Sequence, residues 1–231
     1  ACKELSTIGI NSFELSGGRF FSDVLTKLKD LENQGLNIQI HNYFPVPQNP
    51  FVLNLASKDD LISKLSIDHC MNAIKLAANL KLKRFSVHAG FCIDPSTKEL
   101  GKPFNRKNLI QNRDSFLDRF IKRVKFLKRF ADNLGVDLYI ENNVSIVENI
   151  FDGEPLLLAS NYEEIKNIRD LTDVKILIDT GHLIVSANSL GLNERDELEK
   201  VKGLANAYHL SSNNRLRDQN KPIKNDNAIC K

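Results

Sequence analysis

The sequence predicts an α/β fold whose strands form one parallel sheet. Two observations lead to this prediction: six short apolar segments have the character of strands, and amphipathic segments with helical spacing separate them. Strands that alternate with helices become parallel strands joined by right-handed crossovers. In a chain of 231 residues this pattern allows a (β/α) barrel or an open doubly wound sheet. The barrel is favoured because neither a GxGxxG nor a P-loop sequence follows any predicted strand, and residues 1–231 are expected to form a single domain.

The predicted elements of the first half of the chain are, in order, the end of a helix at 1–6, a strand at 12–15, a helix at 20–34, a strand at 36–41, a helix at 57–82 and a strand at 84–88. Apolar residues recur at helical spacing from Phe21 to Leu31, and Gly35 ends that helix. Ser57 is expected to cap the next helix by accepting a hydrogen bond from the amide of Asp60.

The second half continues the alternation with a helix at 108–133, a strand at 136–141, a helix at 162–170, a strand at 174–179, a helix at 183–202 and a strand at 205–209. The long helix has an apolar stripe from Phe116 to Ala131, and Gly135 ends it. Gly191 interrupts the last helix. Each predicted strand therefore reaches the next one through a helix, as parallel pairing requires.

The composition is that of an ordinary soluble domain, with 42% hydrophobic and 26% charged residues. The net charge of +3 permits a phosphorylated or nucleic-acid ligand but does not indicate one. No apolar run approaches the ~18 residues of a membrane span and no signal peptide is visible, so we expect a cytoplasmic protein without membrane partners. The cysteines form no CxxC pair and are expected to be free thiols; they are Cys2, Cys70, Cys92 and Cys230.

The placement of the histidines is the strongest functional signal. Four of the five lie at or just past the carboxyl end of a predicted strand: His41, His88, His182 and His209. The fifth, His69, lies inside a predicted helix and is expected to be structural. The carboxyl ends of parallel strands meet at one edge of a sheet or one mouth of a barrel. We therefore expect four imidazoles to converge there.

Two carboxylates share this position with the histidines. Glu141 ends one strand, and Asp179 ends another in the sequence Asp179-Thr-Gly-His182. The glycine lets the backbone bend, so that Asp179 and His182 can face one metal ion or one sugar hydroxyl. Any one of these residues alone is more often a buried histidine or a helix-capping acid. Together they favour a divalent-metal site, because mixed imidazole and carboxylate ligands suit zinc, manganese and cobalt.

These motifs resemble those of the xylose isomerase-like TIM-barrel superfamily. The similarity covers residues 14–222 and rests on Ile-Glu141-Asn-Asn, Asp179-Thr-Gly-His182, His209-Leu-Ser-Ser, Val-His88-Ala-Gly and His41. The superfamily contains sugar and sugar-phosphate isomerases and epimerases, and endonuclease IV-like abasic-site nucleases. The resemblance implies an α/β TIM barrel. The first and last strands of such a barrel are not evident, so we expect an incomplete barrel of about six strands whose bare edges can pair with another copy of the chain.

The isomerase branch is the leading hypothesis. There the resemblance implies that Glu141, Asp179 and His209 hold one divalent metal ion, which could be Mn, Co, Zn or Mg. Glu141 would also move a proton on the carbon beside a sugar carbonyl, and His182 would contact a substrate oxygen. Arg215 would meet a hydroxyl or phosphate group. A small carbohydrate is favoured over nucleic acid because no basic, aromatic-rich DNA groove is evident.

Two alternatives stay open. In the nuclease branch His41, His88 and Asp218 would join the ligands of up to three zinc ions in phosphodiester hydrolysis. Against that branch, Asn220 stands where the resemblance implies one more histidine ligand. The other alternative is a non-catalytic barrel with a vestigial metal site, because no Glu follows Glu199 to supply the second carboxylate of the isomerase branch.

Overall fold

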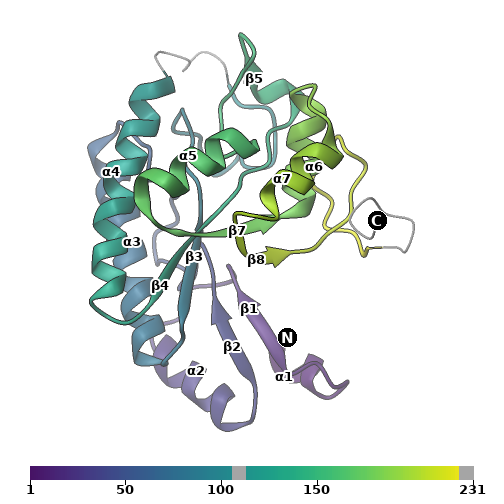
Figure 1. Ribbon diagram of the computed structural model, residues 1–231. Coiled ribbons are helices and arrows are strands. Elements are labelled where there is room, and N and C mark those ends of the chain that lie inside the picture. The colour runs from purple at the N-terminus through teal and green to yellow at the C-terminus, as the bar shows by residue number, and fades with distance from the viewer. Residues whose placement is uncertain (106–112, 224–231) are drawn as a thin grey trace.

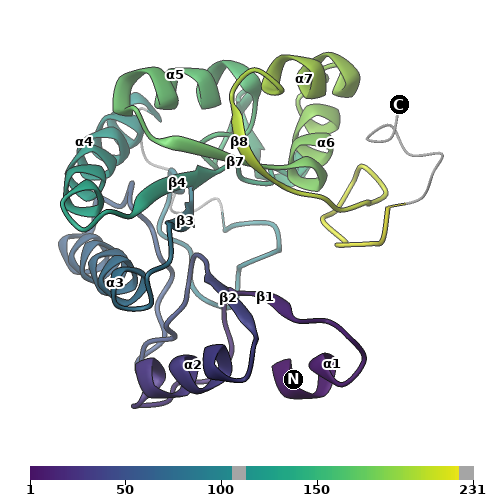
Figure 2. The same ribbon diagram turned by 60° about the horizontal axis from the view of Figure 1, so that its bottom comes forward.

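Parallel strands form the inner layer of the molecule and helices the outer layer (Figure 1). The computed structural model describes residues 1–105 and 113–223. The parallel strands are β1 (Ser12–Leu15), β2 (Asn37–Ile40), β3 (Arg84–His88), β4 (Asp137–Glu141), β7 (Lys175–Asp179) and β8 (Ala205–His209). Figure 2 shows that the helices follow one another around the outside of these strands.

Strand order in space follows the order in sequence. β1 pairs with β2, and β3, β4, β7 and β8 follow one another, all in parallel. A parallel bridge between His41 and Ser86 joins the two groups. The register sets His88 opposite Glu141, and Asp179 opposite His209. The strand ends that carry the predicted site residues therefore lie next to one another.

The helices are α1 (Cys2–Ser6), α2 (Val24–Asn33), α3 (Asp60–Asn79), α4 (Arg113–Asp132), α5 (Tyr162–Thr172), α6 (Thr180–Ser189) and α7 (Glu194–Val201). The predicted apolar stripe of α4, from Phe116 to Ala131, is buried in the core. Between β4 and α5 the chain forms elements that were not predicted: a 3₁₀ turn, η2 (Val147–Asn149), and an antiparallel hairpin of β5 (Ile150–Phe151) and β6 (Glu154–Pro155). Each of these elements has too few residues to produce a periodic pattern in the sequence.

The predicted cap of α3 is wrong. Asp59, not Ser57, is the N-cap residue, and its side chain accepts a hydrogen bond from the amide of Ile62 at 2.9 Å. The Ser57 hydroxyl instead accepts from the amide of Asp59 at 3.0 Å. A carboxylate at this position also interacts favourably with the helix dipole, which a hydroxyl cannot do to the same degree.

The boundaries of two other helices also differ from the prediction. α6 begins directly after β7, because Asp179 caps it by accepting a hydrogen bond from the amide of His182 at 2.9 Å. His182 therefore lies in the first turn of a helix. α2 begins at Val24, four residues later than predicted. Residues 108–112 of the predicted long helix lie outside the described residues.

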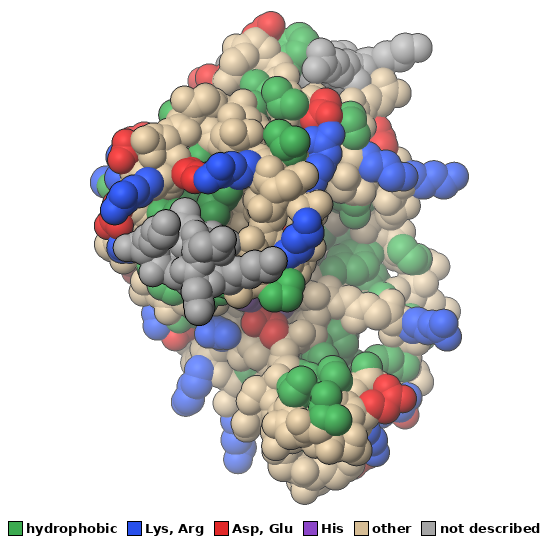
Figure 3. All heavy atoms as spheres, turned by 90° about the vertical axis from the view of Figure 1, so that its right-hand side faces the viewer, with side chains coloured by type: hydrophobic (Ala, Val, Ile, Leu, Met, Phe, Trp, Pro, Cys, Tyr) green, Lys and Arg blue, Asp and Glu red, His purple; other side chains and the backbone are tan. Residues whose placement is uncertain are grey.

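Burial decreases toward the outer strand β8. β3, β4 and β7 are buried over most of their length, whereas β8 alternates between half-buried and exposed residues. Within residues 1–105 and 113–223, no strand pairs with the outer edge of β1 or of β8. Hydrophobic side chains lie at the surface on this side of the molecule (Figure 3). Those exposed in the segments next to the two edges include Ile8, Ile10, Tyr208 and Leu210.

No described helix combines the length and the apolar character that a membrane crossing requires. Cys2, Cys70 and Cys92 are free thiols, as predicted, and Cys230 lies outside the described residues. Burial raises the pKa of Cys70 and of Cys92 to about 12. These two thiols are therefore protonated at neutral pH and are not poised as thiolate ligands.

Candidate metal centre

The predicted site residues converge on one carboxylate, that of Glu141 at the end of β4, which is only 1% exposed. Its Oε2 atom lies 2.9 Å from Nε2 of His41 and 3.3 Å from Nε2 of His88. Its Oε1 atom lies 2.9 Å from Nδ1 of His209 and 3.9 Å from Nδ1 of His182. The structure thus brings all four strand-end histidines to one place.

Two further carboxylates lie beside His182. Its Nε2 atom is 4.0 Å from Oδ2 of Asp179 and 3.4 Å from Oδ2 of Asp218. Asp218 belongs to the segment after β8, which a bridge between Ser212 and Lys221 folds back on itself. Two groups of ligand-type atoms are each close enough to hold a metal ion: His41, His88 and Glu141, and Glu141, Asp179 and His182.

Neighbouring motif residues hold these strand ends together. The Asn142 side chain accepts from the amide of Asp179 at 2.7 Å and donates to its carbonyl oxygen at 3.1 Å. Gly181 has no room for a side chain, because a Cβ atom there would lie 2.2 Å from Oγ of Ser211. Asn142 therefore joins the ends of β4 and β7, and Gly181 lets α6 pack against the segment after β8, while the Glu and Asp of the two motifs face the centre.

Hydrogen bonds fix which imidazole nitrogens keep a lone pair. Nδ1 of His182 lies 2.9 Å from the carbonyl oxygen of Asn142, which can only accept, so this nitrogen carries the proton. The Ser86 hydroxyl donates to Oε1 of Glu14 at 3.4 Å and therefore accepts from Nδ1 of His41 at 2.8 Å. In a neutral imidazole, Nε2 then holds the lone pair.

Nε2 of His41 lies 2.9 Å from a carboxylate oxygen of Glu141 and therefore faces the centre. That oxygen, Oε2, has no hydrogen-bond partner in the described part of the chain, and neither have Nδ1 of His88 and Oδ1 of Asp218, although all three atoms are buried. A buried polar atom without a partner is unfavourable, and a cation held by His41, His88 and Glu141 would give Oε2 of Glu141 a partner. Imidazole nitrogens and carboxylate oxygens suit Zn²⁺, Mn²⁺ or Co²⁺. The residues present therefore fit a divalent metal ion.

Charges at the centre are set by the same contacts. Burial by itself would raise the pKa of Glu141, but the imidazoles of His88, His209 and His41 hold it well below its usual range. Burial lowers the pKa of His88 to about 4, against the opposing effect of the Glu141 charge. Burial also raises the pKa of Asp179. At neutral pH the centre therefore contains an ionised Glu141 beside a neutral His88.

Metal binding is expected to release protons. Hydrogen bonds with Glu14 and with Glu141 raise the pKa of His209 to about 10. Burial opposes the charged form of His182, but Asp218, Asp179 and Glu141 raise its pKa to about 9. Both imidazoles are therefore protonated at pH 7 in the metal-free protein, and each must lose a proton to act as a ligand.

The affinity for Zn²⁺ should accordingly rise as the pH increases from 7 toward 9. Titration calorimetry in buffers of different ionisation enthalpy should give at least one proton released per ion at pH 7, and release of none would contradict the expectation. The metal-free protein should show the opposite trend. Imidazolium pairing stabilises it fully below the unfolded pKa of 6.5, and this stability is lost as the pH rises through the folded values of about 9 and 10.

A pocket of about 480 Å³ opens beside the centre. Its polar lining includes His88, His182, Asp218 and Arg217. The apolar lining includes Tyr43, Phe51, Phe91, Leu100, Phe104 and Leu157. A concave, mostly apolar pocket with a few polar groups is the usual form of a small-molecule site.

Comparison with a family model identifies the fold family. The model described as the xylose isomerase-like TIM barrel matches residues 2–228. The chain belongs to this family. The predicted family resemblance and the α/β TIM-barrel fold are thereby confirmed. No curated protein matches the chain.

Solved structures with the xylose isomerase-like fold include several sugar epimerases. A D-tagatose 3-epimerase-like protein has a TM-score of 0.67 and 19% identity, with 94% of this chain and 73% of that chain covered. D-psicose 3-epimerase from Clostridium cellulolyticum H10 has a TM-score of 0.63 and 16% identity, with 91% and 66% covered. 3-Keto-D-glucoside 4-epimerase from E. coli has a TM-score of 0.62 and 12% identity, with 91% of this chain and 72% of that chain covered. The chain thus spans roughly two thirds to three quarters of the length of these structures, and at such identities the likeness shows the fold.

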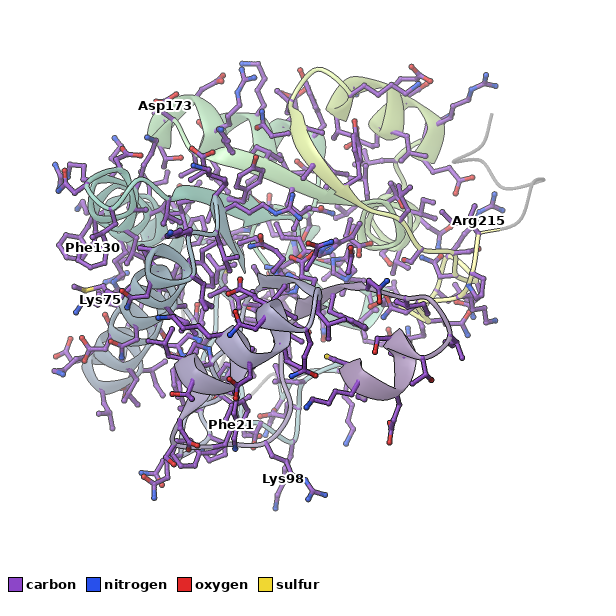
Figure 4. All side chains as sticks on the ribbon, turned by 90° about the horizontal axis from the view of Figure 1, so that it is seen from below. Phe21, Lys75, Lys98, Phe130, Asp173 and Arg215 are labelled. Carbon is purple, nitrogen blue, oxygen red and sulfur yellow. The ribbon has the colours of Figure 1, made fainter. Side chains whose placement is uncertain are left out.

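The structure does not bring Arg215 to this centre. Its guanidinium donates to both carboxylate oxygens of Glu194, at 2.6 and 2.8 Å, and in Figure 4 it lies on the outer part of the C-terminal segment. Arg217, two residues later, lines the pocket instead and pairs with Glu148. The side chains of successive residues in an irregular segment point in different directions, and sequence gives no rule for which one faces a pocket.

The sequence did not predict that Glu14 belongs to the centre. Glu14 in β1 lies 3.2 Å from Nε2 of His209 through its Oε2 atom. The signal that singles out Glu141, a carboxylate near the end of an apolar strand, was also present at Glu14. β1 is only four residues long, however, and Leu15 follows Glu14 within it, so the carboxylate did not mark the strand end.

Proposed function

We propose that this chain is a divalent-metal-dependent isomerase or epimerase that moves a proton on the carbon beside the carbonyl of a sugar or sugar phosphate. The observation that supports this proposal best is the ionised, buried Glu141, next to a pocket of small-molecule size. Four imidazoles lie within 2.9 to 3.9 Å of its carboxylate, and its Oε2 atom has no hydrogen-bond partner among the described residues. Proteins of the same fold that are named D-tagatose 3-epimerase-like protein, D-psicose 3-epimerase and 3-keto-D-glucoside 4-epimerase point to the same class of chemistry.

Glu141, Asp179 and His209 would hold the metal ion, as the family resemblance implies. A bound divalent ion polarises the substrate carbonyl and stabilises negative charge on its oxygen. The ionised carboxylate of Glu141 is the form that accepts a proton from the carbon beside that carbonyl. His182 is held by its Nδ1–H bond to Asn142 and lines the pocket, where its Nε2 atom would meet a substrate oxygen.

The pocket would bind the rest of the sugar. Its aromatic and aliphatic walls can pack on the C–H faces of a sugar and exclude water from the reacting carbon. Arg217 would take the role that sequence analysis gave to Arg215, binding a phosphate or hydroxyl group, because Arg217 lines the pocket. Because His88 and His182 line the pocket and also belong to the centre, a substrate in the pocket would have its polar groups within reach of the centre.

A specific observation favours a second candidate, metal-dependent phosphodiester hydrolysis of the endonuclease IV type. His41 and His88 form one possible ligand group with Glu141, and Asp179 and His182 form another with the same residue. Two ions could share Glu141 in this arrangement, and a pair of ions is a common device for phosphodiester cleavage. The ligand set therefore allows more than the single ion that an isomerase needs.

Metal content and two activity assays separate these candidates. The full chain, purified without chelator, would be analysed for metal and then assayed with Mn²⁺, Co²⁺ or Zn²⁺ on ketoses such as D-tagatose and D-psicose, and on an oligonucleotide with an abasic site. About one ion per chain with ketose interconversion supports the isomerase proposal. Two or three zinc ions with strand cleavage support the nuclease. Metal binding without either activity would support the non-catalytic barrel with a vestigial metal site.

A further inference from the structure

Glu14 connects two of the histidines at the centre although it does not touch Glu141 itself. Its Oε2 atom accepts a hydrogen bond from Nε2 of His209 at 3.2 Å. Its Oε1 atom accepts from the Ser86 hydroxyl at 3.4 Å, and that hydroxyl accepts from Nδ1 of His41 at 2.8 Å. One carboxylate on β1 thus reaches imidazoles that follow β2 and end β8.

The hydrogen bonds to Glu14 and Ser86 fix the ring orientations of His209 and His41. Since Glu14 takes the proton on Nε2 of His209, the other nitrogen, Nδ1, faces Oε1 of Glu141 at 2.9 Å. Since Ser86 takes the proton on Nδ1 of His41, Nε2 faces Oε2 of Glu141 at 2.9 Å. Nδ1 of His209 and Nε2 of His41 therefore point at the two oxygens of the buried Glu141 carboxylate.

The surroundings of Glu14 keep its carboxylate ionised and in place. Arg84 approaches Oε2 at 3.8 Å, and His41 Nδ1 lies 3.9 Å from Oε1. The Ser86 hydroxyl is fully buried, so the bond that it passes from His41 to Glu14 is shielded from water. A carboxylate that accepts a hydrogen bond from the far nitrogen of a ligand histidine is a common way to fix ring orientation and raise ligand basicity.

We propose that Glu14 is a positioning residue that holds His209 directly, and His41 through Ser86, so that Nδ1 of His209 and Nε2 of His41 are presented together to a metal ion beside Glu141. This inference rests on the proposed function, because it requires a metal at the centre. It assigns a role to a residue outside the ligand set that the motifs imply, and the role is to orient ligands rather than to contact substrate.

The variant Glu14→Gln tests the proposal. The amide keeps the shape but has a single acceptor oxygen, so it can serve His209 or Ser86 but not both. Loss of such an outer contact should weaken Zn²⁺ or Co²⁺ binding by about 10- to 100-fold. Competition with a chromophoric chelator measures the dissociation constant. Glu4→Gln is the matched control, because Glu4 is exposed and pairs only with the amino terminus at 3.2 Å among its described contacts.

A second readout separates positioning from a general loss of structure. Long-range ¹H–¹⁵N spectra report which imidazole nitrogen carries the proton, and the resonances of His209 and His41 should change in Glu14→Gln while those of His69 do not. Ser86→Ala should change His41 only, since it leaves the bond from His209 to Glu14 intact. If Glu14→Gln fails to fold, Ser86→Ala still tests whether the link through Ser86 orients His41.

The outcomes distinguish the inference from the function on which it rests. If the wild type binds metal and Glu14→Gln binds it equally well with unchanged imidazole resonances, the positioning role is wrong and the proposed function stands. If the wild type binds metal tightly, Glu14→Gln binds it weakly, and neither protein converts ketoses, the positioning role stands and the isomerase activity is wrong. A wild type that binds no divalent metal would overturn both.

Discussion

With the proposed function, Glu141→Gln is expected to lower turnover by ~10²–10⁴-fold and to abolish tight binding of a divalent metal ion. The carboxylate faces all four imidazoles of the centre, within 2.9 to 3.9 Å. An amide keeps the volume but loses the negative charge, so the ligand-type atoms no longer have a shared anionic partner. Steady-state kinetics and metal analysis of the purified variant measure the two effects.

The matched control is Glu199→Gln. Glu199 in α7 is exposed and pairs with Lys202 at 2.7 Å, and a solvent-screened surface pair of this kind contributes little to stability. The control should keep both turnover and metal content. The assignment of Glu141 would be wrong if Glu141→Gln were folded, retained wild-type metal content and converted substrate at the wild-type rate.

Asp179→Asn is expected to weaken metal binding by more than ~100-fold while the protein stays folded. Asp179 has two roles that this substitution separates. Its Oδ1 atom accepts from the amide of His182 at 2.9 Å as the N-cap of α6, and its Oδ2 atom lies 4.0 Å from Nε2 of the same histidine. Asparagine caps helices as well as aspartate does but carries no charge. Chelator competition measures the loss of affinity.

Asp179→Ala provides the comparison, because it removes the charge and the cap together. The free energy of unfolding of metal-free Asp179→Ala should be ~1 kcal/mol lower than that of metal-free Asp179→Asn, a difference that urea denaturation can measure. Equal unfolding free energies of the two variants would show that the cap contributes nothing. Wild-type metal affinity in Asp179→Asn would instead remove Asp179 from the centre.

Local pattern was enough to find most of the centre. His41, His88, Glu141, Asp179 and His209 each follow or end an apolar run, and a polar residue at that point of a parallel strand is placed by topology rather than by detailed packing. The same reasoning set His69 aside. It is buried in α3, where its ring stacks on Tyr43, away from the cluster.

The errors and omissions share a different origin. Ser57 and Asp59 are both acceptable caps by residue type, and only the path of the chain into α3 decided between them. Arg215 and Arg217 are equivalent in sequence terms, and the fold of one irregular segment turned one to Glu194 and the other to the pocket. Propensity describes a residue and its near neighbours, whereas these choices depend on contacts with other parts of the chain.

The sequence by itself determined the alternation of strands and helices, the parallel sheet and the end of that sheet where imidazoles and carboxylates gather, because all of these follow from short-range periodicity and chain connectivity. Only the tertiary structure decided that Glu14 reaches His209, 195 positions away, and that buried Ser86 links His41 to it. The contacts of Glu14 join β1 to β8 and to β3, neither of which follows β1 in the strand order. Their geometry depends on strand twist and side-chain packing, which no local pattern encodes.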